Sequence, residues 1–245
     1  MKILSRHIKY ILIFLFLLVS IPSVGYNLKQ ITNRNGLSNN SVTAFCQDYT
    51  GLLWIGTCDG LNMYNGKSVS VYKPKDKNNI LSGNLIDRIV EAQDGIMWIQ
   101  TYYGLNKYDK KTNSLEHFDM FNNILFLEKD SQNNIYLIQE NNSIFYYVKE
   151  GNRFEKAELS GIIFDEILDF TITDDNRIWI FTITGKGLCF SINHSLEGKV
   201  EFRREKIYSH DKSLLHCYSE DGSFFFVDSD YRLYEFEAKG HRTVY

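Results

Sequence analysis

The sequence predicts an all-β fold, a β-propeller built of four-stranded antiparallel blades. A segment is repeated after 44 residues, which indicates one supersecondary unit copied along the chain. Each unit holds about four short strands in 40–45 residues, the pattern of a propeller blade. No stretch of the repeated region keeps a helical period. The landmarks that share the 44-residue offset are Leu37 and Leu81, Trp54 and Trp98, and Gly60 and Gly104.

The strands of the first two units are predicted from runs rich in Ile, Val, Tyr, Phe and Thr. They cover residues 42–47, 53–57, 61–64 and 69–72 in the first unit, and 86–91, 97–101, 105–108 and 115–118 in the second. Turn residues separate them, as in Asp48-Tyr49-Thr50-Gly51, Cys58-Asp59-Gly60 and Asn65-Gly66-Lys67. Turns of this kind, only a few residues long, favour antiparallel hairpins.

Three weaker copies follow, each with an aromatic residue where the first two units have tryptophan. Tyr136, Trp179 and Phe225 take this position, and the five aromatic residues are spaced by 44, 38, 43 and 46 residues. The expected blades lie near residues 36–73, 80–118, 123–156, 165–204 and 212–245. Residues 26–32 form a candidate closing strand. The repeats therefore fill one propeller region over 26–245.

Composition agrees with tightly packed β-sheets. The chain has 16 Tyr, 17 Phe and 3 Trp, enough large side chains to fill the space between blades, and only 2 Pro. Its formal net charge is −3 with mixed signs, so no nucleic-acid partner is expected. No phosphate loop, zinc motif or nucleophile elbow is present in the sequence, and no cofactor and no metal are expected.

The first 25 residues are predicted to be a signal peptide. Lys2, Arg6 and Lys9 precede an apolar run of about ten residues, and Ser23 and Gly25 are small residues before the expected cleavage point. The run is shorter than the roughly 20 residues that a membrane helix needs. We expect export to the periplasm, with a membrane-anchored protein as the alternative if the leader is uncleaved.

The four cysteines follow no metal-binding spacing. They are Cys46, Cys58, Cys189 and Cys217. Disulfides within or between blades are one interpretation; small buried thiols in strands are the favoured one.

Most conspicuous residues are expected to serve the fold. Trp54, Trp98 and Trp179 could stack on a sugar, but their shared repeat position favours packing between blades. Gly60 and Gly104 open strands, where glycine commonly serves a tight turn. A series of aspartates stands one per blade and cannot converge on a calcium ion, so we assign it to turns. The series comprises Asp48, Asp94, Asp130 and Asp221.

Tyr102 and Tyr103 are the candidate ligand-binding residues, together with Asp59. The two tyrosines replace Cys58 and Asp59 in the corresponding loop of the second unit. Loops on a regular scaffold carry binding specificity, and paired aromatic rings suit a carbohydrate. The alternative is that one tyrosine packs on the neighbouring blade.

The repeat resembles a known family. The segment from Asp48 through Trp54 to Asn62, repeated around Trp98, is similar to the two-component regulator propeller repeat, and Gly36 to Val42 resembles the start of such arrays. The resemblance implies the periplasmic sensory part of a Bacteroidetes hybrid two-component system. In that family a β-sandwich, a membrane helix and a histidine kinase follow the propellers, and the implied signal is an oligosaccharide.

The resemblance also implies partners that this sequence does not contain. Rings in the family hold more than five blades, and the sequence ends inside an apparent strand. We therefore expect an incomplete arc that associates with further blades or downstream sensor domains, or forms a homodimer. Closure as five blades is the alternative. The favoured function is ligand sensing without enzymatic activity. A non-signalling envelope binding or scaffold protein and a propeller enzyme acting on polysaccharide are the alternatives.

Overall fold

The computed structural model describes residues 29–74, 81–92, 95–157, 167–194, 200–220, 223–237 and 242–244. The chain divides into two compact units, residues 1–31 and residues 32–245, and the described strands all lie in the second. The predicted leader lies outside the described residues. Of the predicted closing strand, residues 29–32 are not in a strand, and residues 26–28 are outside the described part.

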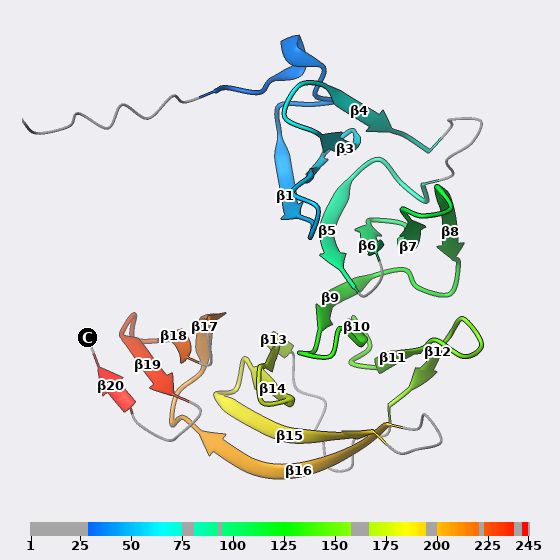
Figure 1. Ribbon diagram of the computed structural model, residues 1–245. Helices are drawn as coiled ribbons and strands as arrows, with labels where there is room; N and C mark the ends of the chain where they lie inside the picture. The colour runs from blue at the N-terminus through cyan, green and yellow to red at the C-terminus, as the bar shows by residue number, and fades with distance from the viewer. Residues whose placement is uncertain are drawn as a thin grey trace, which may run out of the picture. The chain divides into compact units, whose positions relative to one another are not determined.

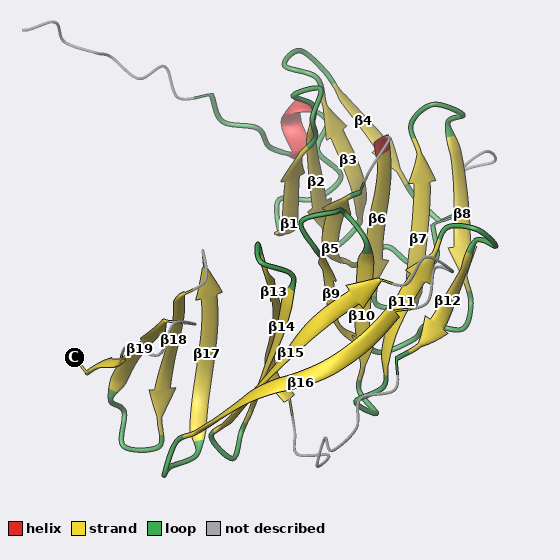
Figure 2. Cartoon of the chain, turned by 60° about the horizontal axis from the view of Figure 1, so that its bottom comes forward, coloured by secondary structure: helices red, strands yellow, loops and turns green. Residues whose placement is uncertain are grey.

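Four-stranded antiparallel sheets make up the second unit, which confirms the predicted fold class (Figures 1 and 2). The first sheet contains β1 (Val42–Gln47), β2 (Leu53–Thr57), β3 (Gly60–Tyr64) and β4 (Val69–Tyr72). The second contains β5 (Ile86–Glu91), β6 (Ile96–Thr101), β7 (Gly104–Asp109) and β8 (Ser114–Phe118). A short 3-10 helix, η1 (Asn33–Asn35), precedes them.

Three further sheets follow in chain order. The third contains β9 (Ile124–Lys129), β10 (Ile135–Gln139), β11 (Ile144–Val148) and β12 (Arg153–Lys156). The fourth contains β13 (Ile167–Thr173), β14 (Arg177–Thr182), β15 (Lys186–His194) and β16 (Val200–Ser209). The fifth contains β17 (Leu214–Glu220), β18 (Ser223–Asp228), β19 (Leu233–Glu237) and β20 (Arg242–Val244). In every sheet the spatial order of the strands is their order along the chain.

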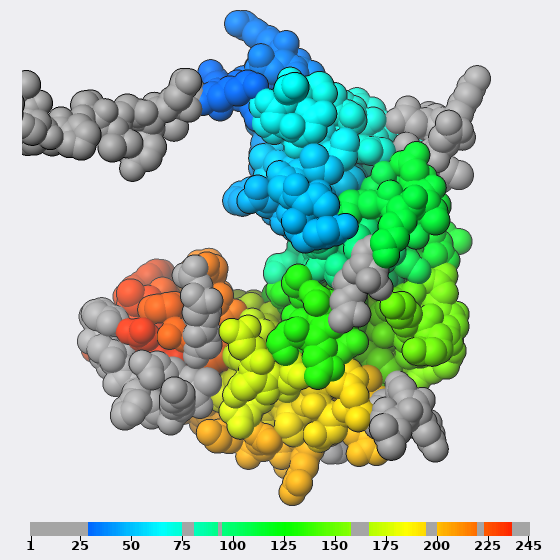
Figure 3. Space-filling view, in the orientation of Figure 1, coloured from blue at the N-terminus to red at the C-terminus, as the bar shows by residue number. Residues whose placement is uncertain are grey.

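Each sheet lies against the next through its first strand. β1 contacts β5, β5 contacts β9, β9 contacts β13 and β13 contacts β17. Figure 3 shows the same succession as adjoining bands of colour. An ion pair between Arg88 on β5 and Glu128 on β9 joins two of these first strands.

The first strand of every sheet has an irregular start. A register shift interrupts its pairing with the second strand at equivalent places in all five sheets. Such a shift leaves one residue unpaired and increases the local twist. Its positions on the first strands are Val42/Ala44, Ile86/Arg88, Ile124/Phe126, Ile167/Asp169 and Leu214/His216.

The hydrophobic core is divided among the interfaces between successive sheets. One cluster of buried side chains joins the first and second sheets, and three others join the second to the third, the third to the fourth and the fourth to the fifth. Burial of apolar surface between layers supplies most of the stability of such a fold.

The repeated aromatic residue on the second strand contacts the following sheet. The Trp54 ring lies 5.4 Å from the Tyr108 ring of the second sheet, between centroids. Trp98 lies 4.8 Å from Tyr147 of the third sheet, and Trp179 lies 5.1 Å from Phe224 of the fifth. All three tryptophans are about 1% exposed, too buried to offer an open face to a sugar.

Phe225 has the same register position but a different environment. It lies opposite Tyr218 and three residues before the end of β18, as Trp54 lies opposite Cys46 and three residues before the end of β2. Phe225 is only half-buried, whereas its neighbours Phe224 and Phe226 are buried against the fourth sheet. Among the described residues no sheet follows the fifth one, so this side chain has no following layer to pack on.

The glycines that open the third strands have backbones that require glycine. Gly60 and Gly104 have φ angles of +128° and +150°. A Cβ atom on Gly60 would lie 2.8 Å from the carbonyl oxygen of Tyr72. Both the conformation and the close approach explain why the Gly-Leu-Asn sequence is repeated.

Replacing Trp98 with alanine should strongly destabilise the protein. Its ring packs against Phe118, Tyr147 and Phe154, so truncation leaves a large cavity in the core between the second and third sheets. We expect the free energy of unfolding, measured by denaturant titration, to fall by about 3–5 kcal/mol. Phe45→Ala is the control, because Phe45 is 76% exposed and its loss should change stability little. Equal losses in the two variants would contradict this account of the core.

Candidate functional site between the second and third sheets

A polar network holds the segment before each of the first two sheets. The Ser38 backbone N–H donates to Asn62 Oδ1 at 2.8 Å, and Asn62 Nδ2 donates to Ser38 Oγ at 2.8 Å. The Ser38 and Thr57 hydroxyls are 2.8 Å apart, and Thr57 donates to the Gly60 carbonyl. The amide of Asn62 therefore satisfies a buried site that would otherwise hold unpaired polar groups.

The same network recurs in the second sheet at the 44-residue offset. Ser82 takes the place of Ser38, Asn106 that of Asn62 and Thr101 that of Thr57, with equivalent hydrogen bonds. Sequence reasoning did not assign a role to these side chains. The repetition of Ser, Thr and Asn at the 44-residue offset could have indicated a shared role. The hydrogen bonds show that this role is structural.

The predicted binding residues lie in the β2–β3 and β6–β7 turns, at one end of neighbouring sheets. Tyr102 is 59% and Tyr103 66% exposed, and their rings meet edge to face with centroids 5.0 Å apart. Tyr103 also lies close to Gly83, where an added Cβ would be 2.9 Å from its Cδ2 atom. Part of one tyrosine thus rests on the neighbouring loop, while both keep exposed surface.

Asp59 is held by ionic and polar contacts on the same end of the sheets. Its Oδ2 atom is 2.6 Å from Lys73 Nζ, and its Oδ1 atom accepts a hydrogen bond from Asn84 Nδ2 at 3.3 Å. Asn84 follows Gly83, the residue beside Tyr103. The loop before β5 therefore lies between Asp59 and the tyrosine pair.

The groove between the first and second sheets, at the opposite end of the strands, is filled by the protein's own side chains. Asp48 in the β1–β2 turn is buried and accepts hydrogen bonds from the backbone and hydroxyl of Thr50 and the backbone of Leu52. It also accepts from Trp54 Nε1 at 2.9 Å and from Lys110 Nζ at 2.9 Å. Burial alone would raise the pKa of Asp48, but these donated hydrogen bonds outweigh it and hold the pKa well below its usual range.

Lys110 completes this first groove. Its ammonium contacts both Asp48 and Glu91 at 2.9 Å and lies 4.4 Å from the centre of the Tyr49 ring. Burial opposes the charged form, but the two carboxylates raise the pKa of Lys110. Two carboxylates and one ammonium thus close the space beside Trp54.

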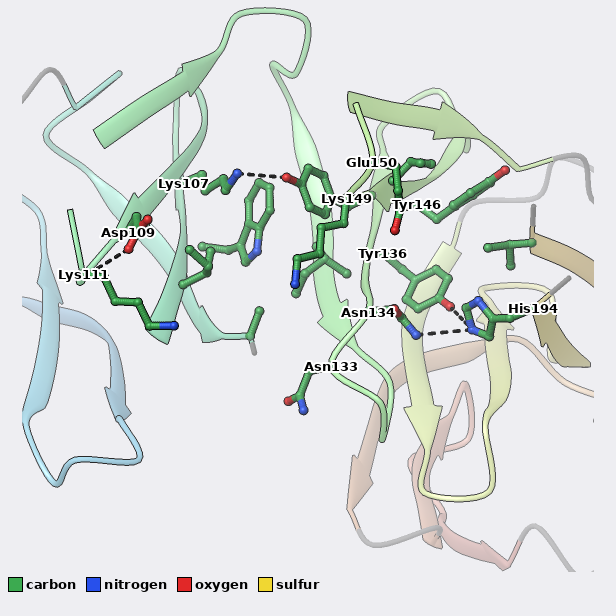
Figure 4. A pocket seen from close by; sticks show the side chains of 17 residues that line it. Lys107, Asp109, Lys111, Asn133, Asn134, Tyr136, Tyr146, Lys149, Glu150 and His194 are labelled. Atoms are coloured by element: carbon green, nitrogen blue, oxygen red, sulfur yellow. Dashed lines mark hydrogen bonds between the residues drawn. The ribbon is translucent and has the colours of Figure 1, made fainter. Parts of the chain in front are cut away.

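The groove between the second and third sheets instead holds a cavity of about 470 Å³ (Figure 4). This volume is within the range of small-molecule sites. The walls come from turns and from strands β6 and β7 of the second sheet, β10 and β11 of the third, and β15 and β16 of the fourth. The lining includes Ala92, Ile96, Trp98, Lys107, Asp109, Lys111, Asn133, Asn134, Lys149, Glu150 and His194.

The two grooves differ at equivalent positions. The backbone N–H of Ala92 donates to the carbonyl of Ile96, as that of Asp48 donates to Leu52, so Ala92 occupies the place of Asp48. Trp98 corresponds to Trp54 through the strand register. Ala92 has no carboxylate, and among the described residues the indole N–H of Trp98 has no hydrogen-bond acceptor.

Lysines line the groove from both sheets. Lys107 Nζ donates to the Tyr147 hydroxyl at 2.9 Å and to Asn152 Oδ1 at 2.6 Å. Figure 4 shows Lys149 extending between Asp109 of the second sheet and Asn134 of the third. An ammonium, an amide and an apolar wall in one cavity suit a polar organic ligand.

The far wall of the cavity is fixed by a second buried aspartate. Asp130 accepts from the Asn134 amide at 2.8 Å and from the Tyr136 hydroxyl at 3.1 Å, and His194 Nε2 lies 3.4 Å from its Oδ2 atom. Burial and the neighbouring Asp130 carboxylate raise the pKa of Tyr136 far above its ordinary value. Sequence reasoning assigned none of these residues to a pocket.

The aspartate series does not converge in the described structure. Asp48 and Asp130 each accept backbone hydrogen bonds in their own turn, while Asp94 and Asp221 lie outside the described residues. Within the described ranges, no group of three His, Cys, Asp or Glu residues is placed to hold a metal ion.

The cysteines are free thiols with different exposure. Cys189 is buried, Cys46 and Cys217 are partly buried, and Cys58 is exposed in the β2–β3 turn. The expectation of buried thiols in strands therefore does not describe Cys58. Burial raises the pKa of Cys189 to about 11, which keeps this thiol protonated and unreactive at neutral pH.

Comparisons with known proteins agree with the repeat. Residues 36–59 match the sequence model of the family described as the two-component regulator propeller. A histidine kinase, P4, of Formosa agariphila is 38% identical over 74 residues, which are 29% of this chain and 5% of the kinase. This chain carries a two-component regulator propeller repeat.

Solved structures with low sequence identity share the fold. The extracellular domain of BT3049 from B. thetaiotaomicron, described as a hybrid two-component system, aligns with a TM-score of 0.64 at 21% identity, over 88% of this chain and 31% of that one. PorZ, a surface component of the type-IX secretion system of Porphyromonas gingivalis, aligns with a TM-score of 0.62 at 16% identity, over 91% of this chain and 29% of PorZ. The chain thus spans about a third of these structures. Across the described residues, no helix has the length and apolar character of a membrane span.

Asp48→Asn should remove a pH-dependent part of the stability. Because hydrogen bonds lower the folded-state pKa of Asp48, its contribution is present above the ordinary carboxyl pKa of about 4 and is lost as the pH falls below it. The variant should be less stable by about 1–3 kcal/mol at pH 7, and the difference should shrink toward pH 3.

Urea titrations of both proteins across this pH range measure the effect. Asp211→Asn is the control, since the Asp211 side chain is 82% exposed and its replacement should leave the free energy of unfolding nearly unchanged. A stability difference for Asp48→Asn that stays constant from pH 7 to pH 3 would contradict the assignment.

Proposed function

We propose that this chain is the ligand-recognition propeller of a two-component signalling system and acts in the periplasm after export by its leader. The repeat at residues 36–59 and the likeness to extracellular domains of hybrid two-component systems support this role. The chain spans a small part of its relatives, so the kinase and regulator functions belong to other segments of such a system. In this proposal the propeller recognises a ligand and is not itself catalytic.

The ligand in this proposal is an oligosaccharide bound at the loop end that carries Tyr102 and Tyr103. The observation that supports this ligand most directly is the pair of exposed tyrosines in the β6–β7 turn, next to the hydrogen bond between Asn84 and Asp59. An aromatic face can stack on the apolar face of a sugar ring, and a carboxylate or amide can bind its hydroxyl groups. The strands beneath are fixed by packing, so a change in this loop alters recognition without altering the fold.

Replacing both tyrosines with alanine should weaken oligosaccharide binding. We expect a loss of roughly 1–3 kcal/mol of binding free energy, since a few aromatic side chains commonly dominate a binding surface. Isothermal titration calorimetry of the purified protein against a panel of neutral and acidic oligosaccharides measures it. The thermal midpoint should change little, because both side chains are largely exposed.

Tyr49→Ala is the matched control for this experiment. Tyr49 is 74% exposed but lies in the β1–β2 turn, at the opposite end of the strands from Tyr102 and Tyr103. Its replacement should leave oligosaccharide affinity unchanged. If the Tyr102/Tyr103 double variant binds as tightly as the unaltered protein, the loop is not the recognition site.

A further inference from the structure

We propose that copies of this chain bind head to tail, with the fifth sheet of one copy against the first sheet of another. The contact joins two different faces. The back face of the fifth sheet carries Tyr218, Phe225 and Leu233, and the front face of the first sheet carries Phe45. The argument comes from the contacts between successive sheets within the chain, which all join a back face to a front face.

Phe45 has a position that is buried in the sheets that have a predecessor. It lies opposite Ile55, the residue after the repeated aromatic one. No sheet precedes the first within the described part of the chain, and Phe45 is 76% exposed. The equivalent residues of the next three sheets are at most 6% exposed. They are Ile89, Leu127 and Phe170.

The back face of the fifth sheet exposes apolar side chains at positions that are covered in the first sheet. Tyr218 is 60% exposed, whereas its equivalent Cys46 packs against the second sheet. Leu233 is 40% exposed, whereas its equivalent Leu61 is 1% exposed. Phe225 lies between these side chains at the position of the repeated aromatic residue and is half-buried. Exposed apolar side chains gathered on one face indicate an interaction surface.

A second copy is the partner that the repeat itself specifies. In each of the four contacts between successive sheets, the residue at the Phe45 position packs in the cluster that holds the aromatic residue of the preceding sheet. Phe225 supplies that aromatic residue in the fifth sheet, and Phe45 supplies the position that receives it in the first. One chain therefore carries both halves of the contact, and two chains together can join them.

The nature of the contact determines how the copies associate. Because the two faces differ, a pair of copies still presents a front face at one end and a back face at the other, so further copies can add. One face of one four-stranded sheet takes part on each copy. The contact is therefore small, and small interfaces are typical of weak, reversible association.

Sedimentation velocity of the purified protein over a range of concentrations tests the association. The weight-average sedimentation coefficient should rise steadily with concentration, because association is weak and reversible. A coefficient that stays at the monomer value up to millimolar concentration would overturn the proposal.

Two charged variants test whether the contact is head to tail. Phe45→Glu and Tyr218→Glu should each remain monomeric, because docking would bury an unpaired carboxylate. Both side chains are largely exposed, so the fold should persist. An equimolar mixture should form dimers and stop there, since one variant keeps its back face and the other its front face. Association of either variant alone, or a mixture that stays monomeric, would contradict the head-to-tail contact.

Ile207→Glu is the matched control for these variants. Ile207 is also an exposed apolar strand residue, but it lies on β16, the outer edge strand of the fourth sheet. This variant should associate as the unaltered protein does. The Tyr102/Tyr103 double variant should also associate normally, so this proposal and the one for saccharide binding can fail separately.

Photo-crosslinking identifies the contact without depending on the folding of the charged variants. p-Benzoylphenylalanine in place of Phe45 should crosslink to peptides from β17 to β19. In an equimolar mixture of isotope-labelled and unlabelled chains, the crosslinked peptides should include pairs of mixed label, which come from two copies. Crosslinks confined to one chain would show the fifth sheet closing on the first sheet of the same molecule, and would overturn the proposal.

Discussion

The contact between the repeated aromatic residue of each sheet and the sheet that follows is the constraint on which the rest of the structure depends. A four-stranded sheet of about 20 residues buries too little surface to be stable alone, so each sheet needs a neighbour. Trp54, Trp98, Tyr136 and Trp179 provide that connection by placing a large ring against the next sheet. Each of these tryptophan and tyrosine rings also carries an N–H or O–H group, which needs a hydrogen-bond acceptor when it is buried.

The interfaces between sheets differ in the acceptor that they provide for this N–H or O–H group. Asp48 accepts from Trp54 in the first, and Asp130 accepts from Tyr136 in the third. In the fourth interface the indole nitrogen of Trp179 is buried and has no hydrogen-bond partner within the described ranges. The second interface has Ala92 at this position and a cavity beside it. Equivalent turn positions therefore present a buried carboxylate to the first interface and a methyl group to the second.

The antiparallel order of the strands places recognition features at two ends of the molecule's sheets. Turns between second and third strands carry Tyr102, Tyr103 and Asp59, whereas turns between first and second strands carry Asp48, Ala92 and Asp130. The second strands of the first four sheets, between the two ends, are largely buried. Exposed turn residues such as Tyr102 and Tyr103 can therefore vary at little cost in stability, whereas buried turn residues such as Asp48 cannot.

The sequence by itself determined the repeat, the strands and the packing role of the aromatic positions, because these follow from alternation, turn residues and a constant offset between neighbours in the chain. The sequence also has Ala92 at the position that corresponds to Asp48, but the sequence alone does not reveal a structural consequence of this difference. Only the tertiary structure brings Ala92 of the second sheet and Lys149 of the third into the lining of one cavity. The sequence also could not predict that Phe225 is only half-buried, because the burial of a side chain depends on which sheet packs against its strand and not only on the residues of that strand.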